Sequence, residues 1–315
     1  MLIAQRSGPG QSFRKGLSLP ELIRMFPDDA TAEAWFADTR WPNGPQCPHC
    51  GSWRIQSGTA HKTMPYRCRE CRRWFSVRTK TVMAESKLGF QVWILAIYLL
   101  TTGIKGTSSM KLHRDLGVTQ KTAWHLAHRI RAMWQAGDFR LSGPVEADET
   151  YIGGKETNKH ESRKLKAGRG TIGKIPVAGI KDRATKEVRA QITQPANKEN
   201  LQRFVEEHRE PDAMLYTDEH YGYDGLPNHE TVRHSVGEYV EEQAHTNGIE
   251  SFWALLKRGY YGTYHKMSEK HLARYIGEFA GRHNARAVDT IQQMAMMAQG
   301  MMGKALPYQA LIADP

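Results

Sequence analysis

The sequence lacks the long apolar segments of membrane proteins and secreted precursors. Its most apolar run, Leu88 to Leu100, contains Gln91 and is 13 residues long, whereas a helix needs about 20 apolar residues to span a bilayer. Residues 1–16 are polar, glycine-rich and basic, without the apolar stretch of a secretory signal. We therefore expect a protein without membrane association that works in the cytoplasm.

Glycine-rich phosphate-binding motifs are also missing, and acidic residues are fewer than basic ones. The glycines between residues 153 and 173 are scattered and form no phosphate cradle. Acidic residues number 33 against 44 Lys and Arg residues, which gives a formal net charge of +11. This excess favours a polyanionic partner, because Lys and Arg that neutralise phosphates release condensed counterions.

Cysteine is scarce, and all four cysteines lie in two CxxC pairs that are separated by 17 residues: Cys47, Cys50, Cys68 and Cys71. This spacing is typical of a zinc ribbon. Disulfides are rare in the cytoplasm, where paired cysteines more often hold metal. Four thiolates complete the tetrahedral coordination of Zn²⁺ and leave no position for water. We therefore predict a structural zinc site and not a catalytic one.

Basic and aromatic residues alternate in the ribbon segment. Arg72 and Arg73 directly precede Trp74 and Phe75. Such a surface suits contact with phosphates and stacking on bases. The aromatic residues could equally form the small core of the ribbon. We predict that Arg72 and Arg73 contact DNA and leave both roles open for the aromatic residues.

The next segment, residues 86–138, has the pattern of a helix-turn-helix. Apolar residues recur at helical spacing from Phe90 onward, and Gly117 interrupts the pattern before a second helix that Thr119 would cap. Such a helix can read the major groove, although the same geometry occurs in proteins that bind no DNA. The DNA-contacting side chains predicted on the second helix are Gln120, Lys121, His125 and Arg129.

Three acidic residues follow on predicted strands and a helix. Asp148 lies in a β-rich alternating segment, Asp218 ends a short apolar strand, and Glu250 lies on an amphipathic helix. The elements predicted between the first two acids are strands at 175–180 and 188–192 and a helix at 198–208. Three strands, a helix, a strand and a helix, with acids at these points, is the order of an RNase H-like core. Carboxylates suit Mg²⁺, a hard cation, and two such ions can clamp the attacking and leaving oxygens of a phosphodiester.

Several motifs resemble those of zinc-ribbon-bearing insertion-sequence transposases with a DDE-type core. The resemblance covers roughly residues 20–290, and its motifs occur in the expected order. The segments that carry it are Glu146–Lys155, Thr217–Tyr223, His245–Gly259 and Gly262–Leu272, together with the first CxxC pair and the preceding Trp41–Pro45.

This resemblance implies that Asp148 and Asp218 are ligands of the catalytic metal. Members of the group have Asn or Glu at the third position, and this chain has both, as Asn247 and Glu250 on one helix face. We prefer Glu250 because a carboxylate binds Mg²⁺ better than an amide. Lys257 lies two turns farther along, where it could contact DNA phosphate. Rival acids for the third position are Glu238, Glu241 and Glu242, which lie on a more solvated stretch.

The predicted fold class is α/β, an RNase H-like core preceded by a zinc ribbon and a helical segment. The expected division is an N-terminal helix and ribbon at 14–85, a helix-turn-helix at 86–138, a catalytic domain at 140–290 and a tail at 291–315. The Met-rich tail is expected to be a packing or oligomer helix and not a cofactor site.

The predicted function is that of an insertion-sequence transposase. It would bind terminal inverted repeats on double-stranded DNA and, with Mg²⁺ or Mn²⁺, cut the 3′ ends and join them to target DNA. A homo-oligomer is expected on DNA because two ends must be brought together. Two alternatives are a zinc-ribbon DNA-binding regulator with an inactive core and a general nuclease of the RNase H type.

Overall fold

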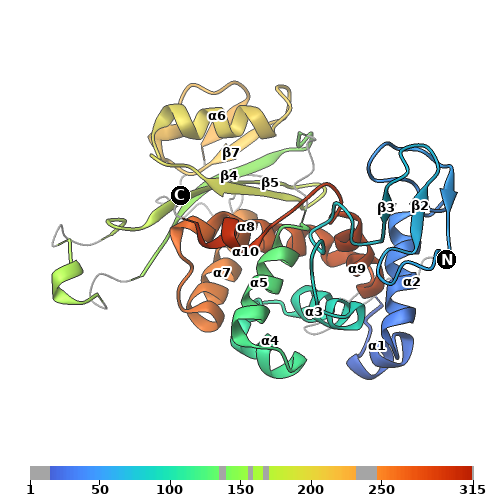
Figure 1. Ribbon diagram of the computed structural model, residues 1–315. Helices are drawn as coiled ribbons and strands as arrows, with labels where there is room; N and C mark the ends of the chain where they lie inside the picture. Colours follow the sequence, from blue (N-terminus) through green and yellow to red (C-terminus); the bar gives the residue numbers. More distant parts are fainter. Residues whose placement is uncertain (1–14, 135–139, 155–158, 166–169, 232–246, 314–315) are drawn as a thin grey trace, which may run out of the picture.

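The computed structural model describes residues 15–134, 140–154, 159–165, 170–231 and 247–313. A five-stranded sheet lies beside a helical region that carries the ribbon (Figure 1). The fold is mixed α/β, as predicted. Among the described residues, no helix has both the length and the apolar character that crossing a membrane requires.

The sheet has the strand order β6-β5-β4-β7-β8, and its first three members pair antiparallel, whereas β4, β7 and β8 run parallel. Its strands are β4 (Val145–Ile152), β5 (Ile175–Asp182), β6 (Val188–Ile192), β7 (Leu215–Thr217) and β8 (His229–Thr231). The first four lie where the apolar patterning predicted them. The edge strand β8 was not predicted, because its three residues are mostly exposed and carry no apolar alternation.

Helices cover both faces of the sheet, so its central strands β4 and β5 are mostly buried on two sides (Figure 1). Successive side chains of a strand point to opposite faces. On one face Val145 and Ala147 pack with α6 (Lys198–His208). On the other, Ile152 packs with α7 (Asn247–Gly259) and α8 (Glu269–Asn284). The acidic residues of β4 are therefore divided between two helical layers.

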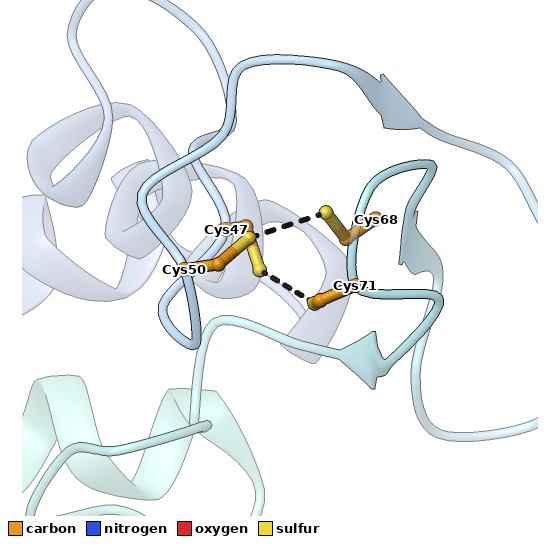
Figure 2. A group of neighbouring side chains, drawn as sticks. All are labelled: Cys47, Cys50, Cys68 and Cys71. Atoms are coloured by element: carbon orange, nitrogen blue, oxygen red, sulfur yellow. Dashed lines mark hydrogen bonds between the residues drawn. The ribbon is translucent and has the colours of Figure 1, made fainter.

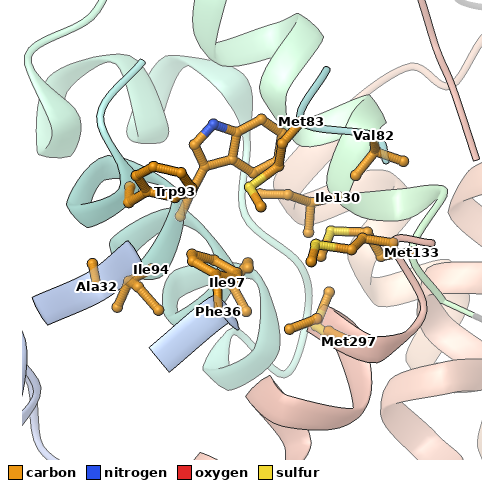
Figure 3. Close-up of a cluster of buried hydrophobic side chains, with 14 of the residues drawn as sticks. Ala32, Phe36, Val82, Met83, Trp93, Ile94, Ile97, Ile130, Met133 and Met297 are labelled. Carbon is orange, nitrogen blue, oxygen red and sulfur yellow. The ribbon is translucent and has the colours of Figure 1, made fainter. Parts of the chain in front are cut away.

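A second core joins the ribbon to helices from both ends of the chain. The ribbon is a three-stranded antiparallel sheet of β1 (Ile55–Gln56), β2 (Tyr66–Cys68) and β3 (Trp74–Phe75). Figure 3 shows Phe36, Trp93, Ile130 and Met297 converging from four helices. The helices around this core are α1 (Leu19–Met25), α2 (Asp29–Arg40), α3 (Phe90–Thr102), α4 (Ser109–Leu116), α5 (Gln120–Arg131) and α9 (Thr290–Gln299). The Met-rich segment is thus a packing helix.

Helices α4 and α5 form the predicted helix-turn-helix. Gly117 has φ +63°, a left-handed conformation that ends α4 and favours glycine. Thr119 then caps α5, since its side chain accepts a hydrogen bond from the backbone N–H of Thr122. Gly117 and Thr119 therefore end α4 and begin α5, as their residue types predicted.

A buried ion network joins α5 to α8. Arg131 Nε donates to Glu278 Oε2 at 2.6 Å, and Arg282 binds the other oxygen of the same carboxylate. The hydroxyl of Tyr264 also donates to Glu278. Three short helical turns at 161–163, 221–223 and 285–287, a π turn at 260–264 and α10 (Tyr308–Ile312) complete the described elements.

Candidate active site and metal centre

Asp148 lies at the middle of the central strand β4, on the face that α7 covers. Its partner in the antiparallel register is Gly179 of β5. Trp253 of α7 packs over this glycine, where an added Cβ would lie 2.4 Å from the indole ring. The indole Nε1 donates to Asp148 Oδ2 at 3.0 Å, and the Glu149 backbone N–H donates to Oδ1 at 2.8 Å. Glycine thus lets the helix approach closely enough to orient the aspartate.

The first turn of α7 is fixed to the same strand by a second carboxylate, Glu146. Its Oε2 accepts the backbone N–H of Ile249 at 2.9 Å, and its Oε1 lies 3.1 Å from Arg183 Nε. Lys181, which pairs with Glu146 across the strands, donates from Nζ to the carbonyl of Gly248 at 2.8 Å. The sequence interpretation missed Glu146 and Lys181, although the two-residue period from Asp148 places Glu146 on the same face.

Asp218 directly follows β7, the parallel neighbour of β4. The register pairs Val145 with Leu215 and Glu146 with Tyr216, so two further residues along each strand bring Asp148 and Asp218 side by side. Oδ1 of Asp218 accepts the backbone N–H of His220 at 3.1 Å. The structure therefore brings the first two predicted acids together, with Asp148 in β4 and Asp218 directly after β7.

Electrostatics at these two residues fit a site for a cation. Burial is the main cause that raises the pKa of Asp148 to about 7, and the negative charges of Glu149 and Asp218 add to it. These causes outweigh the hydrogen bonds that Asp148 accepts from Glu149 and Trp253. A divalent cation would offset this concentration of negative charge, and carboxylate oxygens are the ligands that Mg²⁺ prefers.

The third position lies in the first turn of α7, where Asn247 and Glu250 are both exposed. Glu250 is one turn before Trp253, the residue that contacts Asp148. Lys257 is exposed in the last turn of the same helix. The rival acids Glu238, Glu241 and Glu242 lie outside the described residues. The structure thus places both candidates in the first turn of the helix whose Trp253 contacts Asp148, and does not choose between them.

The carboxylates are more widely spaced than the cysteines. Among the described residues, only the four cysteines form a group of three or more ligand residues with all ligand atoms within 4.8 Å. The carboxylate oxygens of Asp148, Asp218 and Glu250 are therefore not all within 4.8 Å of one another. Ligands that share a pair of ions about 3.5–4 Å apart need not converge on one point, and the like charges repel one another.

The four cysteine sulfurs converge as a tetrahedral site requires (Figure 2). Cys47 Sγ lies 3.7 Å from Cys71 Sγ, and Cys50 Sγ lies 3.6 Å from Cys68 Sγ. Zn–S bonds of about 2.3 Å in a tetrahedron place sulfurs about 3.8 Å apart. Left-handed backbone at Gly51 (φ +75°) and Arg72 (φ +58°), each one residue after a knuckle, turns the chain around the site. This geometry supports structural zinc.

Removal of zinc is expected to unfold the ribbon, because metal binding supplies much of the folding free energy of such small modules. Cys68→Ser should reduce the zinc content below one ion per chain and lower the melting temperature. Trp41, which packs edge-on against Tyr66 and Phe75 of the ribbon, should show a red-shifted fluorescence. Refolding on addition of Zn²⁺ but not Mg²⁺ to chelator-treated wild type is the control. A chelated protein with unchanged melting would contradict the structural role.

The aromatic residues of the ribbon are divided between its core and its surface. Phe75 is fully buried and stacks on Tyr66 at 5.4 Å, so these two form the ribbon core. Trp74 is half-buried, with the Arg67 guanidinium 5.2 Å from its ring centre. Arg72 and Arg73 are exposed beside it. A basic surface therefore remains, with accessible aromatic rings at Trp74 and at Trp53, which is 59% exposed.

The predicted DNA-contacting residues of α5 divide into two pairs. Gln120 and Lys121 are exposed at the start of the helix. His125 and Arg129 are half-buried, and both bind the carbonyl of Leu306, at 2.8 and 3.3 Å. Arg129 also donates to the carbonyl of Ala84 at 2.7 Å. The sequence could not indicate this engagement, because the contacts with Leu306 span more than 170 residues and the contact with Ala84 spans 45.

Comparison with known proteins shows two family matches along the chain. Residues 140–284 match the ISXO2-like transposase domain, and residues 27–74 match the transposase zinc-ribbon domain. A protein of Halobacterium salinarum described as "Uncharacterized protein in transposable element ISH50" is 30% identical over 295 residues, which cover 87% of this chain and 99% of that protein. No solved structure matches significantly.

Proposed function

Because this chain belongs to the family of ISXO2-like insertion-sequence transposases, we propose that it binds the terminal inverted repeats of its element and cuts and joins DNA. The active site for these reactions would contain Asp148 and Asp218. The observation that carries the proposal is that Asp148 lies in β4 and Asp218 directly follows β7, the parallel neighbour of β4. Burial, together with the negative charges of Glu149 and Asp218, raises the pKa of Asp148, which supports a site for a cation at this carboxylate. Such a pair suits the binding of Mg²⁺ or Mn²⁺.

The residues at this site would have different roles in the reaction. Asp148 and Asp218 would hold the metal, with Glu250 as the preferred third ligand and Asn247 as its rival. Bound Mg²⁺ would supply polarisation of the scissile phosphate and stabilisation of the attacking and leaving oxygens. Trp253 fixes the orientation of the Asp148 carboxylate through its indole N–H. Lys257, exposed on the same helix, would contact the DNA phosphates.

DNA binding is assigned to two exposed basic surfaces. Arg72 and Arg73 on the ribbon would contact phosphates, and Gln120 and Lys121 at the start of α5 would reach the major groove. Helix α5 is fixed to the catalytic core through the bond between Arg131 and Glu278. The DNA segment bound by α5 and the DNA segment bound at the active site of the sheet would therefore stay at a constant distance from each other.

Substitutions on α5 should separate DNA contact from stability. Gln120→Ala and Lys121→Ala are both expected to weaken binding to terminal-repeat DNA. Gln120→Ala should cost about 1–3 kcal/mol of binding free energy for the DNA sequence that carries the contacted base. Lys121→Ala should reduce by about one the slope of the logarithm of the binding constant against the logarithm of the salt concentration. Arg129→Ala should instead lower the melting temperature, because it removes the Arg129 donor from the Ala84 carbonyl and leaves the Leu306 carbonyl with His125 alone. Binding isotherms at several salt concentrations and thermal unfolding would measure both effects. Unchanged DNA affinity in both exposed variants would remove α5 from the interface.

The decisive test is strand cleavage and joining on duplexes that carry the element ends, with Mg²⁺ and with Mn²⁺. We expect 3′-end cleavage followed by transfer to target DNA. Specific binding without cleavage under any metal condition would support the regulator with an inactive core. Cleavage without joining, and without preference for the ends, would support a general nuclease.

The oligomeric state on DNA is part of the same proposal. Transposition joins two element ends, so we expect two or more copies of the chain in the complex. Light scattering of the protein with and without paired end duplexes would measure this. A single copy that joins both ends would contradict the expectation.

A further inference from the structure

Glu149, the residue after Asp148, connects the two strands that carry the aspartates. Its side chain points to the face opposite Asp148, as strand alternation requires, and reaches the turn that follows Asp218. The Tyr223 hydroxyl donates to Glu149 Oε2 at 3.1 Å, and His220 Nε2 lies 3.6 Å from Oε1. The side chain of Glu149 is 9% exposed. Both of its carboxylate oxygens thus face groups of one turn.

This turn is itself held rigidly against α6. Tyr223 is fully buried in the core beneath the helix, with Leu201 among its neighbours. Gly222 approaches the same leucine so closely that a Cβ would lie 2.7 Å from it. The His220 ring accepts the Gly222 backbone N–H at 3.2 Å. The turn therefore offers Glu149 a fixed anchor.

Asp218 depends on this turn for its position. The strand that precedes it, β7, has three residues, and only two of them pair with β4. Beyond the strand, Asp218 is held by the hydrogen bond that its Oδ1 accepts from the His220 backbone N–H. Any shift of His220 and Tyr223 relative to β4 would therefore move Asp218 relative to Asp148.

We propose that Glu149 is a positioning residue that fixes the spacing between Asp148 and Asp218 through Tyr223 and His220. The inference rests on the proposed function, in which those two aspartates bind a divalent cation. A residue of this kind acts on the metal ligands without binding the metal, and loss of such partners typically weakens metal binding about 10–100-fold. The competing role is that Glu149 is itself a ligand.

Matched substitutions distinguish the two roles in the zinc-loaded full chain, by titration with Mn²⁺ followed by electron paramagnetic resonance. Glu149→Ala removes both contacts, Glu149→Gln keeps an acceptor for the Tyr223 hydroxyl, and Tyr223→Phe removes only that hydroxyl. A positioning role predicts Mn²⁺ binding about 10-fold weaker in Glu149→Ala and Tyr223→Phe, and nearly unchanged in Glu149→Gln. The double variant Glu149→Ala/Tyr223→Phe should bind no more weakly than Glu149→Ala alone.

Two controls match these changes outside the site. Tyr98→Phe deletes a tyrosine hydroxyl that donates to Leu17 in the other core, and Glu206→Ala removes a charge from the exposed side of α6. Both should bind Mn²⁺ as the wild type does. Thermal unfolding of every variant shows whether the fold is kept.

The outcomes distinguish an error in the positioning role of Glu149 from an error in the proposed function. Weak binding in Glu149→Gln together with normal binding in Tyr223→Phe would overturn the positioning role and make Glu149 a ligand. Normal binding in Glu149→Ala and Tyr223→Phe would overturn both roles for Glu149. If Asp148→Asn and Asp218→Asn also bind Mn²⁺ normally, the proposed metal site itself is wrong.

Discussion

Asp148→Asn and Asp218→Asn are each expected to lower strand cleavage by at least about 10³-fold. Metal ions contribute several kcal/mol of charge stabilisation in such reactions, and each 1.36 kcal/mol corresponds to a tenfold change in rate. Single-turnover cleavage and joining of labelled end duplexes would measure the loss. Asparagine keeps the size of the side chain, so Trp253 can still donate to the oxygen at position 148 and the fold should persist.

Asp212→Asn is the matched control, because Asp212 is exposed in the turn before β7. It should cleave at the wild-type rate, and all three variants should bind end duplexes with similar affinity. Cleavage at the wild-type rate in either Asp148→Asn or Asp218→Asn would refute the assignment of the active site.

The choice at the third position should follow from the same assay. Glu250→Gln is expected to reduce cleavage to nearly the level of the aspartate variants, because a neutral amide binds Mg²⁺ poorly. Asn247→Ala should have a smaller effect. The opposite ranking would make Asn247 the third ligand and would assign Glu250 to the exposed face of α7.

Glu278→Ala is expected to be the most destabilising substitution in the chain outside the zinc site. It would leave the buried guanidinium groups of Arg131 and Arg282 without their carboxylate, and removal of one partner from a buried ion pair typically costs about 3–5 kcal/mol. A decrease in melting temperature of roughly 10 °C follows at about 2–4 °C per kcal/mol. Glu269→Ala, an exposed change on the same helix, should stay within about 0.5 kcal/mol.

The same network gives stability a defined pH dependence. Burial alone would raise the pKa of Glu278, but the charges of Arg282 and Arg131 hold it below its ordinary value of 4.5. A depressed folded-state pKa contributes stability above the unfolded-state pKa, and this contribution is lost as the pH falls through the folded-state pKa. The free energy of unfolding should therefore fall more steeply below about pH 4.5 in the wild type than in Glu278→Gln. Equal slopes in denaturant titrations would show that Glu278 does not titrate on unfolding.

Local patterns in the sequence were enough to predict the main elements of both regions. Strand β6 and helix α6 have the predicted bounds, and the cap at Thr119 and the turn at Gly117 lie where the residue types indicated. Each of these features depends on neighbours within a few positions. The strand β8 was missed because an edge strand of three residues has too little apolar alternation to be seen.

The partners of the candidate site could not be predicted in the same way. Asp148 was found from its strand and motif, whereas its bond to Trp253 joins residues 105 positions apart. The engagement of His125 and Arg129 by Leu306 spans a still longer separation. Such contacts depend on how whole elements pack, and one residue of slip in a strand would reverse which acids face α7.

The sequence by itself predicted the cluster of four cysteines, the main strands and helices, and the strand positions of Asp148 and Asp218, because spacing and alternation are properties of short segments. The tertiary structure alone decided what each of the three clustered acids of β4 contacts. Packing of α6 and α7 on opposite faces directs Glu146 to the start of α7, Asp148 to Trp253, and Glu149 to the turn after Asp218. The physical reason is that a side chain's role depends on the surface it faces, and distant segments build that surface.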